Sequence, residues 1–159
     1  MNKSFLLIAA AGAVAATVAA VWFTRPAPSA IPEFISPSDA AQVARGRIIY
    51  DQNCASCHGA RLEGQPDWRQ RLANGRLPAP PHDVSGHTWH HPDQVLIGIV
   101  KHGLVPGRTA PEGYESDMPA YAGLLKDEDI VAVLAYIKSN WPADAVEAVD
   151  ACFARIARG

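Results

Sequence analysis

The segment Cys54-Ala55-Ser56-Cys57-His58 decides how the rest of this chain is interpreted. Two cysteines separated by two residues and followed at once by histidine are typical of c-type haem attachment. In that chemistry each thiol adds to one haem vinyl group to form a thioether, and the histidine becomes an axial ligand of the iron. The motif therefore predicts haem c bound covalently through Cys54 and Cys57, with the iron held by His58.

A Cys-x-x-Cys pair also occurs in structural zinc sites and in redox-active dithiols. A structural zinc site usually needs a second ligand pair at similar spacing, whereas the third cysteine of the chain, Cys152, stands alone. His87, His90 and His91 could supply nitrogen ligands, but they do not follow a recognised zinc spacing. A thioredoxin-like dithiol should lie beside a βαβ pattern, and the flanks of this motif look helical. Haem attachment is therefore favoured over both alternatives.

Length and composition indicate one small domain with an appendage. The chain has 159 residues, of which 48% are hydrophobic, and a net charge of -2, so nothing suggests nucleic acid as a partner. Three cysteines are too few for a disulfide framework. Thirteen prolines predict long irregular stretches between few helices. A domain with so much loop needs a further constraint, which a covalently held haem would provide.

An uncharged run of 19 residues, Phe5 to Phe23, lies near the N-terminus. As a helix it would span about 28 Å, at roughly 1.5 Å per residue, which is close to the thickness of the bilayer core. Lys3 precedes the run, and Trp22 lies near its end, where interfacial aromatic residues belong. Residues 1–24 are therefore expected to be an uncleaved membrane anchor, with a cleaved signal peptide as the alternative.

Either N-terminal segment would export the domain. The favoured location is the bacterial inner membrane, crossed once, with the haem domain in the periplasm; a soluble periplasmic protein is the alternative. Residues 25–37 follow as a proline-rich linker, which contains Pro26, Pro28, Pro32 and Pro37. Such a segment favours extended, polyproline-like conformations and suits a tether for a small domain that visits partners.

Hydrophobic periodicity and capping residues predict four helices after the linker, with Ser38 as the N-cap of the first. Their expected ranges are 38–53, 92–102, 127–140 and 144–158. In the last helix Cys152 shares one face with Val149, Phe153 and Ile156, which predicts that Cys152 is a small buried hydrophobe. A lipidated, partner-linked or disulfide-forming thiol is the minor alternative.

The first helix and the motif together resemble the class I c-type cytochromes. Gly46, Tyr50 and Cys54 stand at four-residue steps directly before the motif. In that family the glycine and the aromatic residue pack against a C-terminal helix that carries an aliphatic residue and, three positions later, an aromatic one. Val133 and Tyr136 stand at that spacing here.

The resemblance implies an all-α cytochrome c fold, in which the N- and C-terminal helices cross around a covalently bound haem. That domain would cover residues 38–142, preceded by one N-terminal transmembrane helix and followed by a helical extension over residues 143–159.

Three further site residues are implied by the same resemblance. Met118, sixty residues beyond His58 in the loop before the last main helix, matches the distal axial ligand of the iron. A proline carbonyl should accept a hydrogen bond from His58; Pro78, Pro80 and Pro81 are candidates, with Pro80 or Pro81 favoured and Pro80 selected. Trp89 corresponds to a tryptophan that hydrogen-bonds a haem propionate.

These residues predict a single-electron carrier of a periplasmic respiratory or redox chain, with a low-spin haem ligated by His58 and Met118. Its partners would be redox proteins that dock transiently, with no small-molecule substrate. A cytochrome c subunit of a larger dehydrogenase or oxidase complex is the first alternative. An open-site haem enzyme or gas binder is less favoured, because a coordinated thioether leaves no exchangeable position. An assembly or sensing module is also less favoured.

Overall fold

The structure, a computed structural model, describes residue 32 and residues 34–156. The described residues belong to one compact unit. The predicted anchor or signal peptide and most of the predicted linker lie outside the described residues. Within the part of the chain that is described, no helix has both the length and the apolar character needed to cross a membrane.

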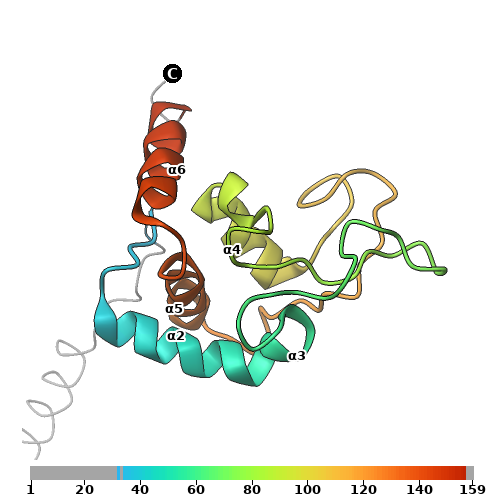
Figure 1. The fold of residues 1–159 in the computed structure, drawn as a ribbon, viewed down its shortest axis with the longest axis horizontal. Coiled ribbons are helices and arrows are strands. Elements are labelled where there is room, and N and C mark those ends of the chain that lie inside the picture. Colours follow the sequence, from blue (N-terminus) through green and yellow to red (C-terminus); the bar gives the residue numbers. More distant parts are fainter. Residues whose placement is uncertain (1–31, 33, 157–159) are drawn as a thin grey trace, which may run out of the picture. The chain divides into compact units, whose positions relative to one another are not determined.

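Six helical elements follow one another along the described residues (Figure 1). They are α2 (Ala40–Asn53), α3 (Ala55–His58), the 3-10 helix η1 (Thr88–His90), α4 (Asp93–His102), α5 (Asp127–Lys138) and α6 (Ala143–Ile156). Over residues 34–156 there is no β-strand, only one isolated bridge between Pro106 and Ala110. The prediction of an all-α fold with long loops between few helices is therefore confirmed.

Helix α2 begins one residue later than the sequence predicts, because Asp39 and not Ser38 is its N-cap. The Asp39 carboxylate accepts hydrogen bonds from the backbone N–H groups of Ala41 and Gln42, at 3.0 and 3.1 Å. Such a cap typically stabilises a helix by about 1 kcal/mol. At the other end of α2, the backbone N–H of Cys54 donates to the Tyr50 carbonyl at 2.8 Å, so the helical path leads directly into α3.

Helices α2 and α5 cross as the resemblance implies. Gly46 lies against α5, where Ala132 and the Cβ atom of Tyr136 are its nearest neighbours. One turn later the fully buried Tyr50 ring lies 5.4 Å from the Tyr136 ring, measured between centroids. Val133, the expected aliphatic partner, is buried too, but the backbone that Gly46 meets is that of Ala132.

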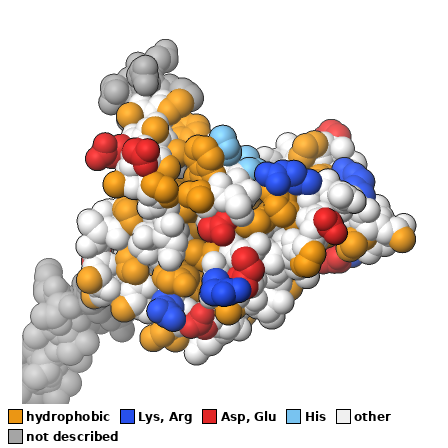
Figure 2. All heavy atoms as spheres, viewed as in Figure 1, with side chains coloured by type: hydrophobic (Ala, Val, Ile, Leu, Met, Phe, Trp, Pro, Cys, Tyr) orange, Lys and Arg blue, Asp and Glu red, His pale blue; other side chains and the backbone are white. Residues whose placement is uncertain are grey.

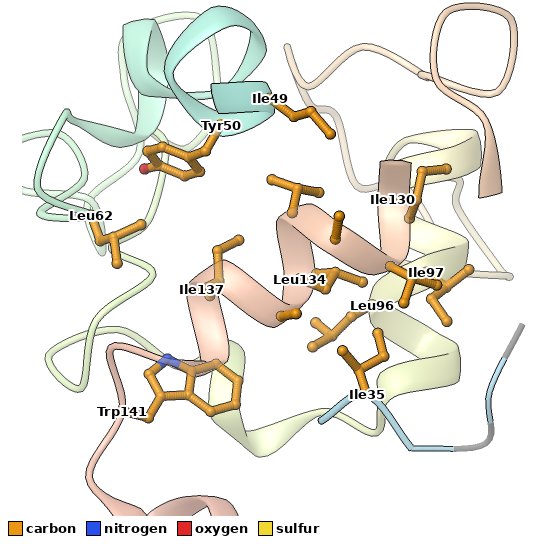
Figure 3. Close-up of a cluster of buried hydrophobic side chains, with 14 residues drawn as sticks. Ile35, Ile49, Tyr50, Leu62, Leu96, Ile97, Ile130, Leu134, Ile137 and Trp141 are labelled. Atoms are coloured by element: carbon orange, nitrogen blue, oxygen red, sulfur yellow. The ribbon is translucent and has the colours of Figure 1, made fainter. Parts of the chain in front are cut away.

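The hydrophobic core is built around α5, which runs through the middle of the cluster in Figure 3. Every residue from Ile130 to Lys138 is buried except the half-buried Tyr136. Leu96 and Ile97 of α4 pack against it from one side, and Ile49 and Tyr50 of α2 from another. This arrangement leaves both long loops on the outside of the helices, where they form the site described below.

Ile35, within the predicted linker, belongs to the core. Its side chain is only 1% exposed, and its backbone N–H donates to the Asp93 carboxylate at 2.6 Å. Gln94 also holds the preceding segment, because its side-chain amide donates to the carbonyl of Pro32 at 2.8 Å. The last residues of the proline-rich segment are therefore packed on α4.

A buried charge cluster joins three helices. The Lys138 ammonium of α5 is fully buried and lies 2.8 Å from the Asp93 carboxylate of α4 and 3.0 Å from the Asp150 carboxylate of α6. A buried charge is tolerated only when its partners satisfy it, so these two carboxylates determine where the Lys138 side chain can lie. The cluster therefore ties α6 to the body of the domain.

The prediction that Cys152 is buried is wrong, since its thiol-bearing side chain is exposed on α6. The face that α6 turns towards the domain carries Val149, which is 8% exposed, together with the partly buried Val146 and Asp150. Cys152 shares the hydrophobic periodicity of that face but lies beyond the part that other elements cover. Periodicity marks a possible apolar face, whereas burial depends on how much of it is covered.

Candidate haem site

The motif lies on the short helix α3, directly after α2. Cys54 is partly buried and Cys57 is exposed, and no disulfide joins them. Burial, followed by the neighbouring Cys57, raises the pKa of Cys54 to about 11. A reactive dithiol needs a nucleophilic thiol with a lowered pKa, and Cys54 does not have one.

The imidazole of His58 is buried and has a defined tautomer. Its Nδ1 atom lies 2.8 Å from the carbonyl oxygen of Pro80. Because a carbonyl can only accept, Nδ1 must carry the proton, and Nε2 keeps its lone pair. Burial lowers the pKa of His58, although the hydrogen bond to Pro80 acts in the opposite direction. The ring is therefore a neutral imidazole whose Nε2 can bind a metal. Of the three candidate prolines, Pro80 is the one that accepts this bond.

Two glycines lie in close contact with the backbone of Pro80 and Pro81. A Cβ atom at Gly64, whose φ is 69°, would lie 2.4 Å from the backbone nitrogen of Pro81. A Cβ atom at Gly86 would lie 2.0 Å from the carbonyl oxygen of the same proline. Both contacts exclude any side chain at the two glycines, so the backbone can approach the prolines closely. We call Gly64 and Gly86 the glycine pair.

Met118 lies in the loop between α4 and α5 and is partly buried. Two contacts tie this loop to the motif side of the domain. The Tyr121 hydroxyl donates to the carbonyl of Asn53 at 2.7 Å, next to Cys54. Beside Met118, the Asp117 carboxylate forms an ion pair with Arg76, which belongs to the loop that follows α3. The backbone N–H of Met118 donates to the Ser116 hydroxyl at 3.0 Å.

Trp89 lies on η1 and carries an unpaired polar atom. Its indole Nε1 is buried and has no hydrogen-bond partner among the described residues. A buried N–H without an acceptor costs about 1–3 kcal/mol, so such a group usually has an acceptor that is not part of the protein. A haem carboxylate would be such an acceptor, and this observation agrees with a haem bound beside Trp89.

Sequence reasoning missed His82, which stacks on His58. The two ring centroids are 4.0 Å apart and the ring planes differ by 22°. Burial, followed by the neighbouring His58, holds the pKa of His82 well below its ordinary value. The one signal that could have identified His82 is its position in the sequence, two residues after Pro80. A residue so near the proline that contacts His58 must itself lie close to His58.

The three histidines singled out in the sequence do not form a metal site. The His87 ring stacks on Trp68 with centroids 5.5 Å apart, and it meets His91 edge to face at 5.4 Å. His90 stacks on Trp89 at 3.9 Å. Over the described part of the chain, no group of three or more His, Cys, Asp or Glu side chains could hold a metal ion. These rings therefore pack as an aromatic cluster around η1.

Comparison with known proteins identifies the family. Residues 43–141 match the family described as cytochrome c. The chain belongs to the cytochrome c family. It is also 34% identical, over 100 residues, to the cbb3-type cytochrome c oxidase subunit CcoP of Azospirillum brasilense, and 34% identical over 102 residues to the same subunit of Azospirillum sp. (strain B510). Each alignment covers 63% of this chain and 29% of the relative, so the chain spans less than a third of those subunits.

A shorter similarity links the chain to a cytochrome c-555 of Prosthecochloris aestuarii. The two are 37% identical over 51 residues, which cover 28% of this chain and 52% of that cytochrome. Membership of the cytochrome c family establishes the cofactor as covalently bound haem c with its iron, and the general role as electron transfer. The buried neutral imidazole of His58 and the unpaired Trp89 N–H fit such a group.

Proposed function

We propose that this cytochrome is a single-electron carrier whose haem is bound through Cys54 and Cys57 and whose iron is ligated by His58 and Met118. When bound, the haem supplies a reversible one-electron iron couple. The chain holds the ligands, sets their basicity and limits access of water. Ligation by a histidine and a methionine leaves no exchangeable position and raises the reduction potential, which suits transfer without substrate chemistry.

The observation that carries this proposal is the hydrogen bond of 2.8 Å between His58 Nδ1 and the Pro80 carbonyl. In the neutral ring this bond places the proton on Nδ1 and leaves Nε2 unprotonated. It also gives the ring a partner that orients it and raises its basicity as a ligand. His58 is 8% exposed, and within the described residues its one hydrogen bond from the ring is at Nδ1.

Support for Met118 comes from the way its loop is held. Tyr121 on one side and Asp117 on the other connect the loop to Asn53 and Arg76 respectively. Both connections lead to segments that flank the motif, one before Cys54 and one in the loop after α3. A thioether in a loop restrained at both ends is a suitable distal ligand, because the protein can keep it within bonding distance.

Trp89 is proposed to donate its indole N–H to a haem propionate. Its Nε1 is buried without a partner among the described residues. An ionised carboxylate would satisfy that donor with a charge-assisted hydrogen bond, which is stronger than a neutral one. The tryptophan would thereby fix the orientation of the haem in the pocket.

Electron transfer partners are proposed to dock transiently on the haem domain. The face drawn in Figure 2 shows basic, acidic and hydrophobic side chains interspersed. Leu72, Val84 and Leu124 are large hydrophobic side chains with at least half of their surface exposed. Surfaces that mix charged and hydrophobic side chains suit weak redox encounters, which usually bury less than about 1,200 Å².

The domain organisation and location are proposed from the sequence. Residues 1–24 would anchor the protein in the bacterial inner membrane, residues 25–37 would link the anchor to the domain, and residues 38–142 would carry the haem in the periplasm. Residues 143–159 would add the extension that contains α6. The core position of Ile35 shortens the part of the linker that is free to extend.

A second candidate function is a cytochrome c subunit of a larger oxidase complex. The similarity to CcoP of two Azospirillum species favours it, because that protein is a subunit of a cbb3-type cytochrome c oxidase. Purification from mild detergent separates the two candidates: a subunit remains with other polypeptides at a fixed stoichiometry, whereas a free carrier elutes alone.

The test of the main proposal is the visible spectrum of the oxidised and reduced protein, recorded during a redox titration. A low-spin haem c with the weak red absorption band of an iron–thioether bond is expected in the oxidised state. A high-spin spectrum, or immediate binding of cyanide and carbon monoxide, would show an open iron site and end the carrier proposal.

A further inference from the structure

His82 lies against the face of the residue that is proposed to bind the iron. Its ring centroid is 4.0 Å from that of His58, and the two planes are within 22° of parallel. At this distance the rings are in van der Waals contact, so His58 cannot rotate about its Cβ–Cγ bond without displacing His82. The hydrogen bond to Pro80 restrains the edge of the His58 ring, and His82 restrains its face.

The His82 ring is itself held firmly. Its Nδ1 lies 2.8 Å from the hydroxyl oxygen of Thr88, a buried residue on η1. Since the Thr88 hydroxyl donates to the Pro81 carbonyl at 3.4 Å, its oxygen is left to accept the proton that His82 carries on Nδ1. The Tyr50 ring meets His82 edge-on, with centroids 6.3 Å apart.

The backbone of His82 is restrained as well. Its N–H donates to the Leu62 carbonyl at 2.8 Å. Its carbonyl accepts from the indole N–H of Trp141, also at 2.8 Å. Leu62 and Trp141 belong to the buried core (Figure 3), so the position of His82 is determined by the packing of the whole domain. A side chain with both backbone groups and its ring fixed can transmit that rigidity to the ring on which it stacks.

We propose that His82 is a positioning residue that sets the plane of the His58 imidazole at the iron. This inference rests on the proposed ligation by His58. The orientation of an axial imidazole decides how its π orbital overlaps the two iron d orbitals that share the unpaired electron in low-spin ferric haem. The orientation therefore determines the spacing of the three g values, and it contributes to the reduction potential.

Two substitutions of similar volume distinguish whether the His82 ring acts by stacking on His58 or only by filling space. His82→Phe keeps a flat ring that can stack, whereas His82→Leu fills the position without one, and both lose the hydrogen bond to Thr88. The holo-protein of each variant is examined by low-temperature electron paramagnetic resonance, by redox titration and by thermal unfolding. Ile35→Ala, which opens a cavity in the core beside Asp93, controls for general loss of packing.

The unmodified protein and His82→Phe are expected to give one narrow set of low-spin g values. His82→Leu should give broadened or duplicated g values and a shifted midpoint potential, while Ile35→Ala should lower the thermal midpoint without changing the g values. Identical g values and potentials in the Phe and Leu variants, with differences confined to thermal unfolding, would overturn the positioning role. An unmodified protein without a histidine-ligated low-spin signal would overturn it together with the proposed function.

Discussion

A Cβ atom placed on Gly46 would lie 1.9 Å from the carbonyl oxygen of Ala132, so α2 and α5 meet backbone to backbone at their crossing. The neighbour is main chain and cannot move aside as a flexible side chain would. Any residue larger than glycine must therefore separate the helices, and α2 leads at its C-terminal end directly into the motif.

The crossing predicts that Gly46→Ala destabilises the holo-protein by about 1–3 kcal/mol, the usual cost of overpacking. Gly98 of α4 provides a matched control, because it is also inside a helix but its Cβ would meet only the Thr109 side chain at 3.6 Å. Gly98→Ala should be neutral or stabilising by up to about 1 kcal/mol. The measurement is denaturant unfolding, and equal effects at the two glycines would contradict the crossing.

Covalent attachment predicts that haem stays with the polypeptide after denaturation and acid–acetone extraction. Replacing both Cys54 and Cys57 with serine should release all of it, because no thioether can form. Cys152→Ser is the control, since that thiol is exposed on α6 and takes no part in the motif. Haem that is lost from the unmodified protein, or from Cys152→Ser, would refute the assignment of the two attachment sites.

Distal ligation predicts that Met118→Ala loses the red absorption band, lowers the midpoint potential and binds carbon monoxide or cyanide readily. Ser116→Ala removes the hydroxyl that accepts from the Met118 N–H but keeps the thioether, so it should retain the band. If Met118→Ala left the spectrum unchanged, Met118 would be a packing residue and another group would have to be the sixth ligand.

The buried charge cluster around Lys138 predicts that the loss of one carboxylate strongly lowers the free energy of unfolding. Asp93→Asn removes the carboxylate 2.8 Å from the buried ammonium, and breaking such a pair costs roughly 3–5 kcal/mol. Asp51→Asn is the control, because its partner Arg47 is exposed and 4.0 Å away, and exposed pairs contribute less than about 1 kcal/mol. Free energies of unfolding that are the same for both variants would show that the buried Asp93–Lys138 pair stabilises the protein no more than an exposed pair does.

The histidines around η1 predict a dependence of stability on pH. Burial, followed by neighbouring histidines, lowers the pKa of His87 and of His91. In the unfolded chain both titrate near about 6.5, so below that pH the unfolded state binds more protons than the folded state. The free energy of unfolding should therefore fall as the pH drops from about 6.5 towards the lower folded pKa values.

Replacing His87 and His91 together with glutamine should reduce this slope between pH 7.5 and pH 5.5, measured by denaturant unfolding. Some slope should remain, because the pKa of His82 is also lowered. A double variant with the slope of the unmodified protein would mean that the two rings titrate alike in the folded and unfolded states.

Local patterns in the sequence predicted a large part of this structure. The motif at Cys54, the crossing at Gly46 and the ranges of the helices depend on residues that are close together in the chain or follow a fixed spacing. Pro80 was among the favoured candidates because the family resemblance limits the choice to a short segment. Such features need no knowledge of how distant segments pack.

The features that the sequence did not predict depend on packing between distant segments. His82 is held near His58 by hydrogen bonds from its backbone to Leu62 and Trp141, which are distant from it in the chain. Ile35 belongs to the core, and its backbone N–H is hydrogen-bonded to Asp93, which is far from it in the sequence. Cys152 fits the spacing of apolar residues along α6, but that spacing does not show how much of the helix is covered by the rest of the domain.

The glycine pair, Gly64 and Gly86, has a consequence for the speed of electron exchange. Gly64 and Gly86 let the backbone close on the prolines from two sides, so the carbonyl dipole that faces His58 Nδ1 has little freedom to turn. When the charge of the centre changes by one unit, a dipole that is already oriented has no reorientation to complete. With His58 as the proposed ligand of the iron, a backbone without side chains at these two positions is therefore expected to keep the reorganisation energy small on the His58 side.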